Sequence, residues 1–414
     1  MTPARQRVRA QWLAGKATQA VFGALAQGGF RVRAVGGVVR NTLLGLPVTD
    51  IDLATDALPQ DVMRVAEAAG FKTIPTGLSH GTVTVIAHSQ PFEITTLRRD
   101  VASDGRHAEV AFTTDWAADA RRRDFTINAL YCDADGAIFD PLGGVADLDP
   151  VRVRFIGDAS ARIREDYLRI LRFFRFTAVY TADGALDKAG LAACTAERAG
   201  LVQISGERIQ AELYKLLIAR HAGTVTAALV ESLVWSAIFG VAPLAGDLAR
   251  LIAIEERVGF ASDPVRRLAA LAVDKAEDAR MLDRRLKLSS EHRGRLSRIA
   301  AHVGQILPVI GERKHRELAY RWGMPAYEDA ALVAWARSGA GVDDAGWMVT
   351  ATLGERFTPP VFPISGRDLV ALGFPPGPAV GDELARMEMD WIKADFVGDR
   401  EALLRQIEIR FSDS

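Results

Sequence analysis

The feature that most constrains the fold of this 414-residue chain is a change in its hydrophobic period near Gly157. Before that point, short runs rich in β-branched residues alternate with turn signals, whereas after it apolar residues recur at helical spacing. The expected strands cover residues 31–35, 49–53, 82–87, 92–97, 129–132 and 151–155, and helices are expected at residues 38–44 and 61–69. The pattern predicts an α+β chain, in which a mixed sheet with helices precedes a wholly helical part.

Composition narrows the class of protein. The chain is longer than one hydrophobic core usually supports, and 49% of its residues are apolar while 25% are charged, so we expect two to four globular modules. Cys132 and Cys194 lie far apart without metal-ligand partners, which argues against a disulfide framework or a zinc site. The longest uncharged run near the middle, residues 232–246, is too short to span a bilayer. We therefore expect a cytoplasmic protein with reduced thiols and no membrane segment.

Residues 35–52, VGGVVRNTLLGLPVTDID, end in two aspartates separated by one residue. If residues 49–53 form a strand, its period of two places Asp50 and Asp52 on one face and the apolar residues on the other. Two carboxylates on one face are hard oxygen ligands that suit Mg²⁺ and leave coordination positions for substrate phosphates. Asp50 and Asp52 are therefore the first candidate catalytic residues and metal ligands.

The same segment begins with Gly36 and Gly37, followed by Arg40. Glycines allow the backbone to approach phosphate oxygens, and a helix that starts near residue 38 would direct its N–H groups, together with Arg40, at the same charge. Alone, a glycine pair is often only a turn, and Asp-x-Asp is often a solvated strand edge or a helix cap. The combination favours nucleotide chemistry, although it is neither a P-loop nor a G-x-G-x-x-G fingerprint.

A hairpin is predicted over residues 81–97, with its turn at residues 88–91. Its second strand carries Glu93. This residue is a third candidate catalytic carboxylate and metal ligand if its side chain points to the same face as the aspartates. The alternative is a paired carboxylate at a strand edge.

Residues 162–175, RIREDYLRILRFFR, form a second segment with a chemical pattern. Asp166, Arg169 and Arg172 recur every three residues and Arg175 continues the row, so they can share a helix face. Cytosine and adenine present an amino donor beside a ring-nitrogen acceptor, and a carboxylate beside a guanidinium selects these two bases. Asp166 and Arg169 form such a pair, whereas Arg172 and Arg175 suit a triphosphate. The alternative is an ion-pair ladder worth about a few tenths of a kcal/mol.

The net charge of −1 argues against a nucleic-acid partner, but the distribution of charge favours one. Residues 151–176 hold seven arginines against three acids, and residues 280–298 hold seven Lys or Arg against two acids. Such stripes suit a phosphate backbone, and the alternative is a solvated helix face. In the second stripe, the residues expected to contact a phosphate backbone are Arg284, Arg285 and Arg295.

A further arginine cluster, RRRDFTINAL at residues 121–130, lies between the predicted sheet and the helical part. Its position favours a triphosphate clamp that includes Arg123. The alternative is the solvated end of a helix.

Four motifs together resemble those of class II tRNA nucleotidyltransferases, the family of bacterial CCA-adding enzymes and poly(A) polymerases. They are GGVVR at residues 36–40, DID at residues 50–52, RRDFTINAL at residues 122–130 and EDYLR at residues 165–169. Their order and spacing also match. The resemblance is specific over residues 31–220 and weaker beyond them.

The resemblance implies a polymerase-β-like head followed by a helical neck, body and tail. The expected domains are the head at 1–155, neck helices that read the nucleobase at 156–220, the body at 221–355 and a tail that contacts tRNA at 356–414. It also implies two metal ions on the aspartate pair. The nucleotide contacts that it implies are Gly37, Arg40, Arg123, Asp166, Arg169, Arg172 and Arg175. Asn41 departs from the family pattern, because many members have Asp there, and residues 100–116 resemble the loop used to switch from C to A.

The implied activity is template-independent addition of C, C and A to the 3′ end of tRNA, with Mg²⁺ as cofactor and release of pyrophosphate. The implied partners are tRNA, CTP and ATP, with no membrane and no obligatory protein partner. Two alternatives stay open. A poly(A) polymerase shares the head motifs, and a catalytically silent RNA-binding protein is less favoured because it would not need metal ligands.

Overall fold

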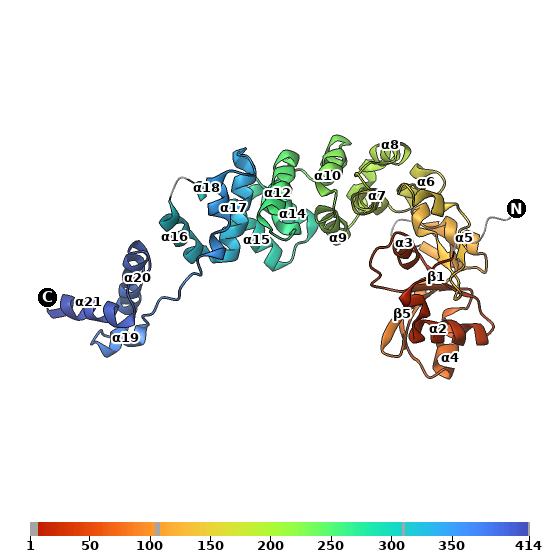
Figure 1. Ribbon diagram of the computed structural model, residues 1–414, viewed down its shortest axis with the longest axis horizontal. Coiled ribbons are helices and arrows are strands. Elements are labelled where there is room, and N and C mark those ends of the chain that lie inside the picture. Colours follow the sequence, from red (N-terminus) through yellow and green to blue (C-terminus); the bar gives the residue numbers. More distant parts are fainter. Residues whose placement is uncertain (1–6, 104–107, 309–310, 413–414) are drawn as a thin grey trace. The chain divides into compact units, whose positions relative to one another are not determined.

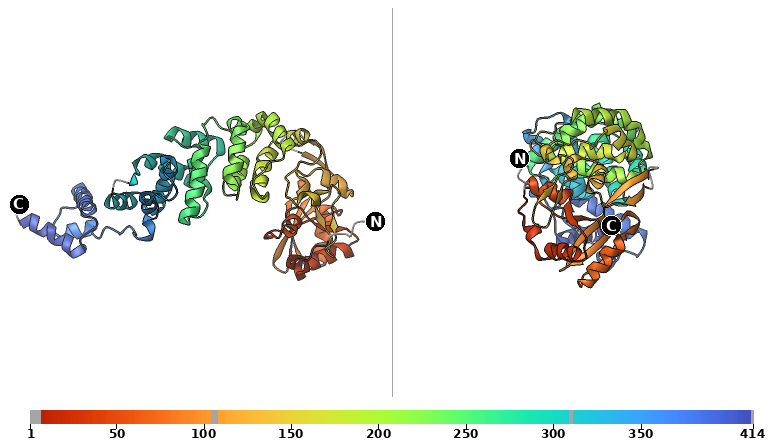
Figure 2. Two further views of the ribbon diagram at one scale, coloured as in Figure 1. Left: turned by 45° about the horizontal axis from the view of Figure 1, so that its top comes forward. Right: turned by 90° about the vertical axis from the view of Figure 1, so that its right-hand side faces the viewer.

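The computed structural model describes residues 7–103, 108–308 and 311–412. The chain divides into two compact units, Met1–Gly240 and Val241–Ser414. Among the described residues, strands occur only in the first unit, and Figures 1 and 2 show the arrows confined to the red-to-orange part of the ribbon. The predicted α+β organisation is therefore confirmed. No helix in the described part of the chain is both long and apolar enough to cross a bilayer.

A seven-stranded sheet forms the centre of the first unit, in the order β3-β4-β5-β2-β1-β8-β9. Its strands are β1 (Val32–Val35), β2 (Asp52–Thr55), β3 (Lys72–Gly77), β4 (Thr82–Ala87), β5 (Gln90–Thr96), β8 (Tyr131–Cys132) and β9 (Ile138–Phe139). Neighbouring strands are antiparallel except β2 and β5, which are parallel. A separate two-stranded sheet pairs β6 (Arg98–Ser103) with β7 (Ala108–Phe112).

Two helices, α2 (Lys16–Gln27) and α4 (Pro59–Ala68), cover one face of the large sheet (Figure 1). The strand residues that face them alternate with polar ones, and Leu53, Val83 and Ile94 are almost completely buried in this core. Because side chains alternate between the faces of a strand, the polar residues are displayed on the opposite face. That second face carries the candidate site.

The other helices of the first unit lie before the sheet, between its strands or after them. They are α1 (Gln11–Ala14), α3 (Gly37–Leu43), η1 (Leu78–His80), α5 (Trp116–Arg121), η2 (Thr126–Asn128), η3 (Gly144–Asp147), α6 (Ala159–Glu165), α7 (Leu168–Tyr180), α8 (Lys188–Glu197), η4 (Arg198–Gln203), α9 (Gly206–Leu217), α10 (Ala222–Glu231) and α11 (Val234–Ile238). The predicted helices at residues 38–44 and 61–69 correspond to α3 and α4.

All secondary-structure elements in the described residues of the second unit are helices. Its elements are α12 (Ala245–Val258), α13 (Pro264–Ala272), α14 (Ala276–Leu286), α15 (Ser290–His302), η5 (Val303–Gln305), α16 (Glu312–Trp322), α17 (Met324–Ser338), α18 (Ala345–Ala351), η7 (Leu353–Glu355), α19 (Gly366–Ala371), α20 (Pro378–Lys393) and α21 (Arg400–Ser412).

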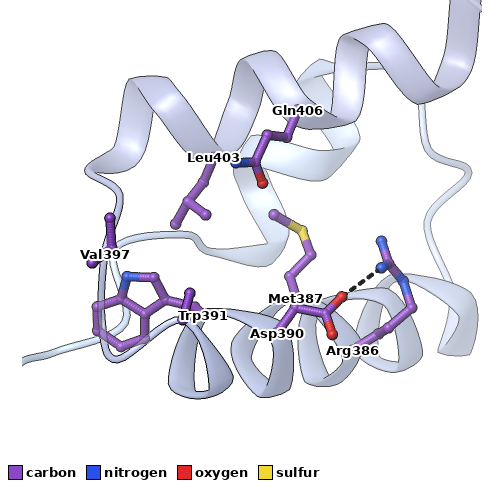
Figure 3. A pocket seen from close by; sticks show the side chains of 8 residues that line it. Arg386, Met387, Asp390, Trp391, Val397, Leu403 and Gln406 are labelled. Atoms are coloured by element: carbon purple, nitrogen blue, oxygen red, sulfur yellow. Dashed lines mark hydrogen bonds and ion pairs between the residues drawn. The ribbon is translucent and has the colours of Figure 1, made fainter.

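The last three helices, α19 to α21, have a small core of their own around Trp391 and Leu403. A cavity of about 380 Å³ lies beside this core, and Figure 3 shows Met387 and Trp391 next to the ion pair between Arg386 and Asp390. Its lining combines apolar side chains with one ion pair and lacks the paired carboxylates of the cavity described below.

Two predicted strands differ from the structure at their ends. The strand predicted at residues 49–53 begins only at Asp52 and continues to Thr55. Its neighbour β1 stops at Val35, because the next residue, Gly36, has a φ of 72° and turns the chain into α3. The residues before Asp52 therefore have no partner on the β1 side of the sheet.

The strand predicted at residues 151–155 is wrong, and the one predicted at residues 129–132 is reduced to β8. Val153 and Phe155 are buried while Arg152 and Arg154 are exposed, so the alternation in the sequence is real. However, this segment makes only isolated bridges, such as that between Phe125 and Phe155. Alternating burial therefore arose here without a continuous neighbouring strand.

The expectation that Asp166 shares a helix face with the three arginines is wrong, because Asp166 separates α6 from α7. Asp166 has extended backbone angles, φ −156° and ψ 102°, and its Oδ1 accepts a hydrogen bond from the backbone N–H of Leu168 at 3.1 Å. A short carboxylate side chain favours this capping position over a helix interior. Arg169, Arg172 and Arg175 do share one face, on α7.

The hairpin predicted at residues 81–97 is confirmed as β4 and β5. The chain reverses at His88 and Ser89, whose φ values are 48° and 65°. The loop-like segment predicted at residues 100–116 includes most of the β6–β7 hairpin and the start of α5, and residues 104–107 lie outside the described part.

A buried ionic network holds the helices of the second unit together. Glu255 on α12 is 0% exposed and accepts hydrogen bonds from Arg266 and Arg267 on α13, each at 2.7 Å. Asp329 on α17 accepts two hydrogen bonds from Arg295, at 2.6 and 2.8 Å. Arg295 is therefore held by carboxylates of α17 and of the residue before α13, and its contact with a phosphate backbone stays a prediction.

We expect Glu255→Gln to destabilise the second unit by about 3–5 kcal/mol, because two buried guanidinium groups lose their charged partner. The measurement is a urea or thermal unfolding transition of the full chain. Glu256→Gln is the matched control, since this neighbouring carboxylate is exposed, and it should change stability by less than about 0.5 kcal/mol. Equal effects of the two substitutions would contradict a structural role for the network.

Candidate active site

A cavity of about 590 Å³ opens on the polar face of the sheet in the first unit. Strands β2 and β5, the turn before α3, the end of α5 and helix α7 all contribute to its lining, and Arg208 reaches it from α9. Eight arginines and four acidic residues line it. This excess of positive charge suits a polyanionic ligand.

Two carboxylates stand side by side in the cavity because β2 and β5 are parallel neighbours. Asp52 is paired in register with Glu93, and both line the cavity. Burial, followed by repulsion from Glu93, raises the pKa of the Asp52 carboxyl, whereas Arg123 opposes the rise. Glu93 is a candidate metal ligand only if its side chain shares a face with Asp52. The register of the two strands places both side chains on one face, so this condition is met.

Asp50 lies outside the lining of this cavity. Its exposed carboxylate accepts a hydrogen bond from Thr49 Oγ1 at 3.0 Å, yet it is near enough to contribute to the raised pKa of Asp52. Among residues 7–103, 108–308 and 311–412, no group of three or more His, Cys, Asp or Glu side chains is arranged to hold a metal ion. A cation at Asp52 and Glu93 would relieve their repulsion, and substrate oxygens would have to complete its coordination.

The turn before α3 brings Arg40 into the cavity wall. Arg40 is only 5% exposed, and burial lowers its pKa. Its guanidinium donates to the Tyr180 hydroxyl at 2.5 Å, to Asn128 Oδ1, and to Asn41 Oδ1 at 2.8 Å. Asn41 also donates to the carbonyl of Pro47 at 2.9 Å. An aspartate at residue 41 has no N–H group and could not donate to the Pro47 carbonyl. The asparagine that replaces the family's aspartate therefore stabilises this turn locally.

Arg123 stands beside the same turn, 3.6 Å from the point where a Cβ on Gly36 would lie. It is held by Asp119 on α5, which is 1% exposed and accepts hydrogen bonds from Arg123 at 3.0 Å and from Tyr131 at 2.7 Å. Burial alone would raise the pKa of Asp119, but Arg123 and Arg122 outweigh it and keep the carboxylate ionised. The positive charge of Arg123 is therefore fixed in place.

Two of the arginines of α7, Arg172 and Arg175, are each anchored by a buried carboxylate. Arg172 donates twice to Asp124 Oδ2, at 2.8 and 2.6 Å, and Arg175 donates to Glu212 at 2.5 Å. Although burial would raise the pKa of Asp124, Arg172 and the Asn128 amide lower it. Each guanidinium carries five N–H donors, so both retain donors for a ligand.

Asp166 and Arg169 line the cavity together, but they do not pair with each other. Asp166 accepts a hydrogen bond from Arg208 at 2.7 Å, whereas Arg169 donates to Glu165 at 2.6 Å and to the carbonyl of Arg162 at 2.7 Å. The ion-pair ladder proposed as the alternative for these two residues is therefore not formed. Both are fixed by other groups and face the same cavity.

Four positioning residues were not found from the sequence: Asp119, Asp124, Glu212 and Arg208. Asp119 precedes Arg122 and Arg123 by three and four residues, a helical spacing that could have indicated the contact. Glu212 and Arg208 lie about forty residues from their partners, and no local pattern marks them. Only the packing of α9 against α7 brings them into place.

A carboxylate pair at the centre of an arginine-lined cavity on a mixed sheet is the arrangement of a nucleotidyltransferase, which must bind a triphosphate and hold metal ions at its reacting phosphate. Residues 32–154, which contain most of this sheet, match the family described as the Poly A polymerase head domain.

Curated relatives extend the similarity over nearly the whole chain. The CCA tRNA nucleotidyltransferase 1, mitochondrial, of Danio rerio is 37% identical over 388 residues, which cover 91% of this chain and 86% of that protein. The CCA-adding enzyme of Streptococcus gordonii is 32% identical over 392 residues, covering 92% and 94% of the two chains. A crystal structure of the Bacillus stearothermophilus CCA-adding enzyme in complex with CTP superposes with a TM-score of 0.74 at 27% identity, covering 96% and 99%.

These similarities show that the chain belongs to the class II CCA-adding tRNA nucleotidyltransferases. The resemblance found in the sequence motifs is thereby confirmed, as is the nucleotidyltransferase head followed by a helical part.

Proposed function

We propose that the cavity on the head sheet is where this enzyme adds C, C and A to the 3′ end of tRNA, using CTP and ATP and releasing pyrophosphate. The 3′ hydroxyl of the tRNA attacks the α-phosphate of the nucleotide, and the bond to the β-phosphate breaks. The observation that carries this proposal is the pair of Asp52 and Glu93, in register at the centre of a cavity with an excess of arginines.

Enzymes of this family use a divalent metal ion, and we propose Mg²⁺, held by Asp52 and Glu93 with Asp50 as an outer contributor. When bound, the ion would assist deprotonation of the attacking hydroxyl and neutralise charge on the leaving pyrophosphate. The raised pKa of Asp52 supports this assignment, because two adjacent carboxylates repel each other until a cation joins them.

The arginines serve the triphosphate in this proposal. Arg123 and Arg40 stand at the turn of Gly36 and Gly37, where the backbone can approach phosphate oxygens. Arg172 and Arg175 extend the positive wall along α7. Carboxylates fix the orientation of Arg123, Arg172 and Arg175 before the substrate arrives. Tyr180 and two asparagine side chains do the same for Arg40. Little reorganisation is therefore needed as charge develops in the transition state.

Asp166 and Arg169 are proposed to select the base. A carboxylate accepts from the exocyclic amine of C or A, and a guanidinium donates to the adjacent ring nitrogen. Uracil and guanine present the opposite polarity and would leave buried groups unpaired. The contact between Arg208 and Asp166 supports this role, because it holds the carboxylate within the cavity lining.

Product length tests the activity and separates it from the two alternatives. The purified protein is incubated with tRNA transcripts that lack one, two or three terminal nucleotides, with CTP and ATP supplied separately and together. The proposed function predicts that each transcript is extended only to the complete CCA end. A long A tail would indicate a poly(A) polymerase, and binding without extension would indicate a silent RNA-binding protein.

The domain limits at residues 155, 220 and 355 remain proposals, as does the assignment of tRNA contacts to the tail. A cytoplasmic location likewise remains a proposal. In the stripe at residues 280–298, the exposed Arg284 and Arg298 are better placed for contact with the RNA backbone than the ion-paired Arg295.

We expect Asp52→Ala to abolish incorporation of both nucleotides while tRNA binding persists, because the carboxylate serves the chemistry common to every step. Asp50→Ala should also reduce both incorporations. Single-turnover extension and filter binding measure the two properties. Asp61→Ala, which removes a half-buried carboxylate on α4 that pairs with Arg64 and does not line the cavity, is the control and should retain activity. Normal turnover by the Asp52 variant would refute the site.

We expect Asp166→Asn and Arg169→Met to lower discrimination against UTP and GTP, by about tenfold or more, because one unpaired buried polar group costs about 1–3 kcal/mol. Single-turnover incorporation of all four nucleotides measures the ratios. Arg164→Met is the control, since this arginine pairs with Glu197 and does not line the cavity. If the variants slow all four nucleotides by the same factor, these residues do not read the base.

We expect Arg284→Glu and Arg298→Glu to weaken tRNA binding and to flatten its dependence on salt, by roughly one unit in the log–log slope for each lost phosphate contact. Binding measured across a salt series gives the slope. Arg257→Glu, an exposed change on α12, is the matched control within the same unit. Slopes that remain equal to wild type would indicate a solvated helix face.

A further inference from the structure

Two threonines line the cavity without a role in the site described so far. Thr95 follows Glu93 by two residues on β5, so both side chains lie on the same face, and Thr82 on β4 is the register partner of Thr95. Their hydroxyl groups are 3.0 Å apart and only partly buried. Ile94 and Val83, on the opposite face, are almost completely buried. The threonines therefore continue the polar face of the sheet beyond the carboxylates.

The strand order decides on which side of Asp52 these threonines lie. The sheet runs β4-β5-β2-β1, so Asp52 on β2 stands between the threonines on one side and the Gly36 turn that follows β1 on the other. Arg123 lies beside that turn. The Gly36 turn with Arg123 and the threonine pair are therefore on opposite sides of the catalytic carboxylate.

Phosphoryl transfer places the attacking and leaving oxygens roughly in line across the phosphorus. If the pyrophosphate leaves toward the arginine side, the attacking 3′ hydroxyl must approach from the threonine side. We propose that Thr82 and Thr95 form a subsite for the 3′-terminal ribose of the RNA acceptor and hydrogen-bond to its 2′ hydroxyl. This inference rests on the proposed function and adds a subsite for the second substrate.

The chemistry of this wall fits a sugar better than a triphosphate. Each threonine hydroxyl offers one donor and two acceptor positions, so the bond between the two hydroxyls leaves one donor and several acceptor positions unused. Arg98 is the arginine that lines the cavity near this side, and its side chain donates to the carbonyl of His80. A ribose hydroxyl is both donor and acceptor, and it distinguishes RNA from DNA.

The test compares two acceptors, tRNA transcripts that lack the terminal A and end in either a ribonucleotide or a 2′-deoxyribonucleotide. Both keep the 3′ hydroxyl. For the wild type, we expect kcat/KM to favour the ribose end by roughly three- to tenfold, the value of one or two neutral hydrogen bonds. Thr82→Val with Thr95→Val should bring this ratio close to one, and the Thr→Ser pair should restore it. The KM for ATP should stay unchanged.

The matched control is Thr76→Val with Thr84→Val. These threonines form a similar hydroxyl pair, 2.9 Å apart, but they do not line the cavity. This control should keep the wild-type ratio. A valine pair at residues 82 and 95 that retains the ratio, or a control pair that loses it, would overturn the subsite. A wild type with no ribose preference would do the same, whereas a wild type that extends neither acceptor would refute the proposed function itself.

Discussion

The site depends on carboxylates that pair with most of the arginines in the cavity and hold them in place. Several guanidinium groups in one small cavity repel one another and lose hydration, so buried counter-charges are needed to keep them in place. Asp119 holds Arg123, and Asp124 holds Arg172. These carboxylates remain ionised in spite of burial, because the arginines lower their pKa values. The cavity therefore keeps its positive charge and its shape without a ligand.

The same pairs connect elements that are distant in sequence. Asp124 follows α5 while Arg172 lies on α7, and Glu212 on α9 holds Arg175. The sheet, the cluster after α5 and the first long helices are thus tied together at the site itself. A substitution that removes one of these carboxylates would affect the binding geometry as well as stability, because the partner guanidinium would lose its orientation.

The order of the strands adds a second constraint, on the sides from which the two substrates can approach Asp52. Because β2 stands between β1 and β5, Asp52 has the glycine turn on one side and Glu93 with the threonine pair on the other. In-line transfer needs two approach paths on opposite sides of the phosphorus. A single sheet face thus provides a place for each substrate, while α2 and α4 cover the opposite face.

The sequence by itself determined the α+β organisation, the hairpin that carries Glu93, and the motifs with the carboxylates and arginines, because periodicity and short motifs are local properties. It wrongly placed Asp166 on a helix face with the arginines that follow it, and it did not show the ion pairs of Arg295. Only the tertiary structure decided the register of Asp52 with Glu93 and the contact of Arg208 with Asp166. The physical reason is that partner choice depends on strand order and helix packing, which join residues far apart in the chain and leave no mark on local spacing.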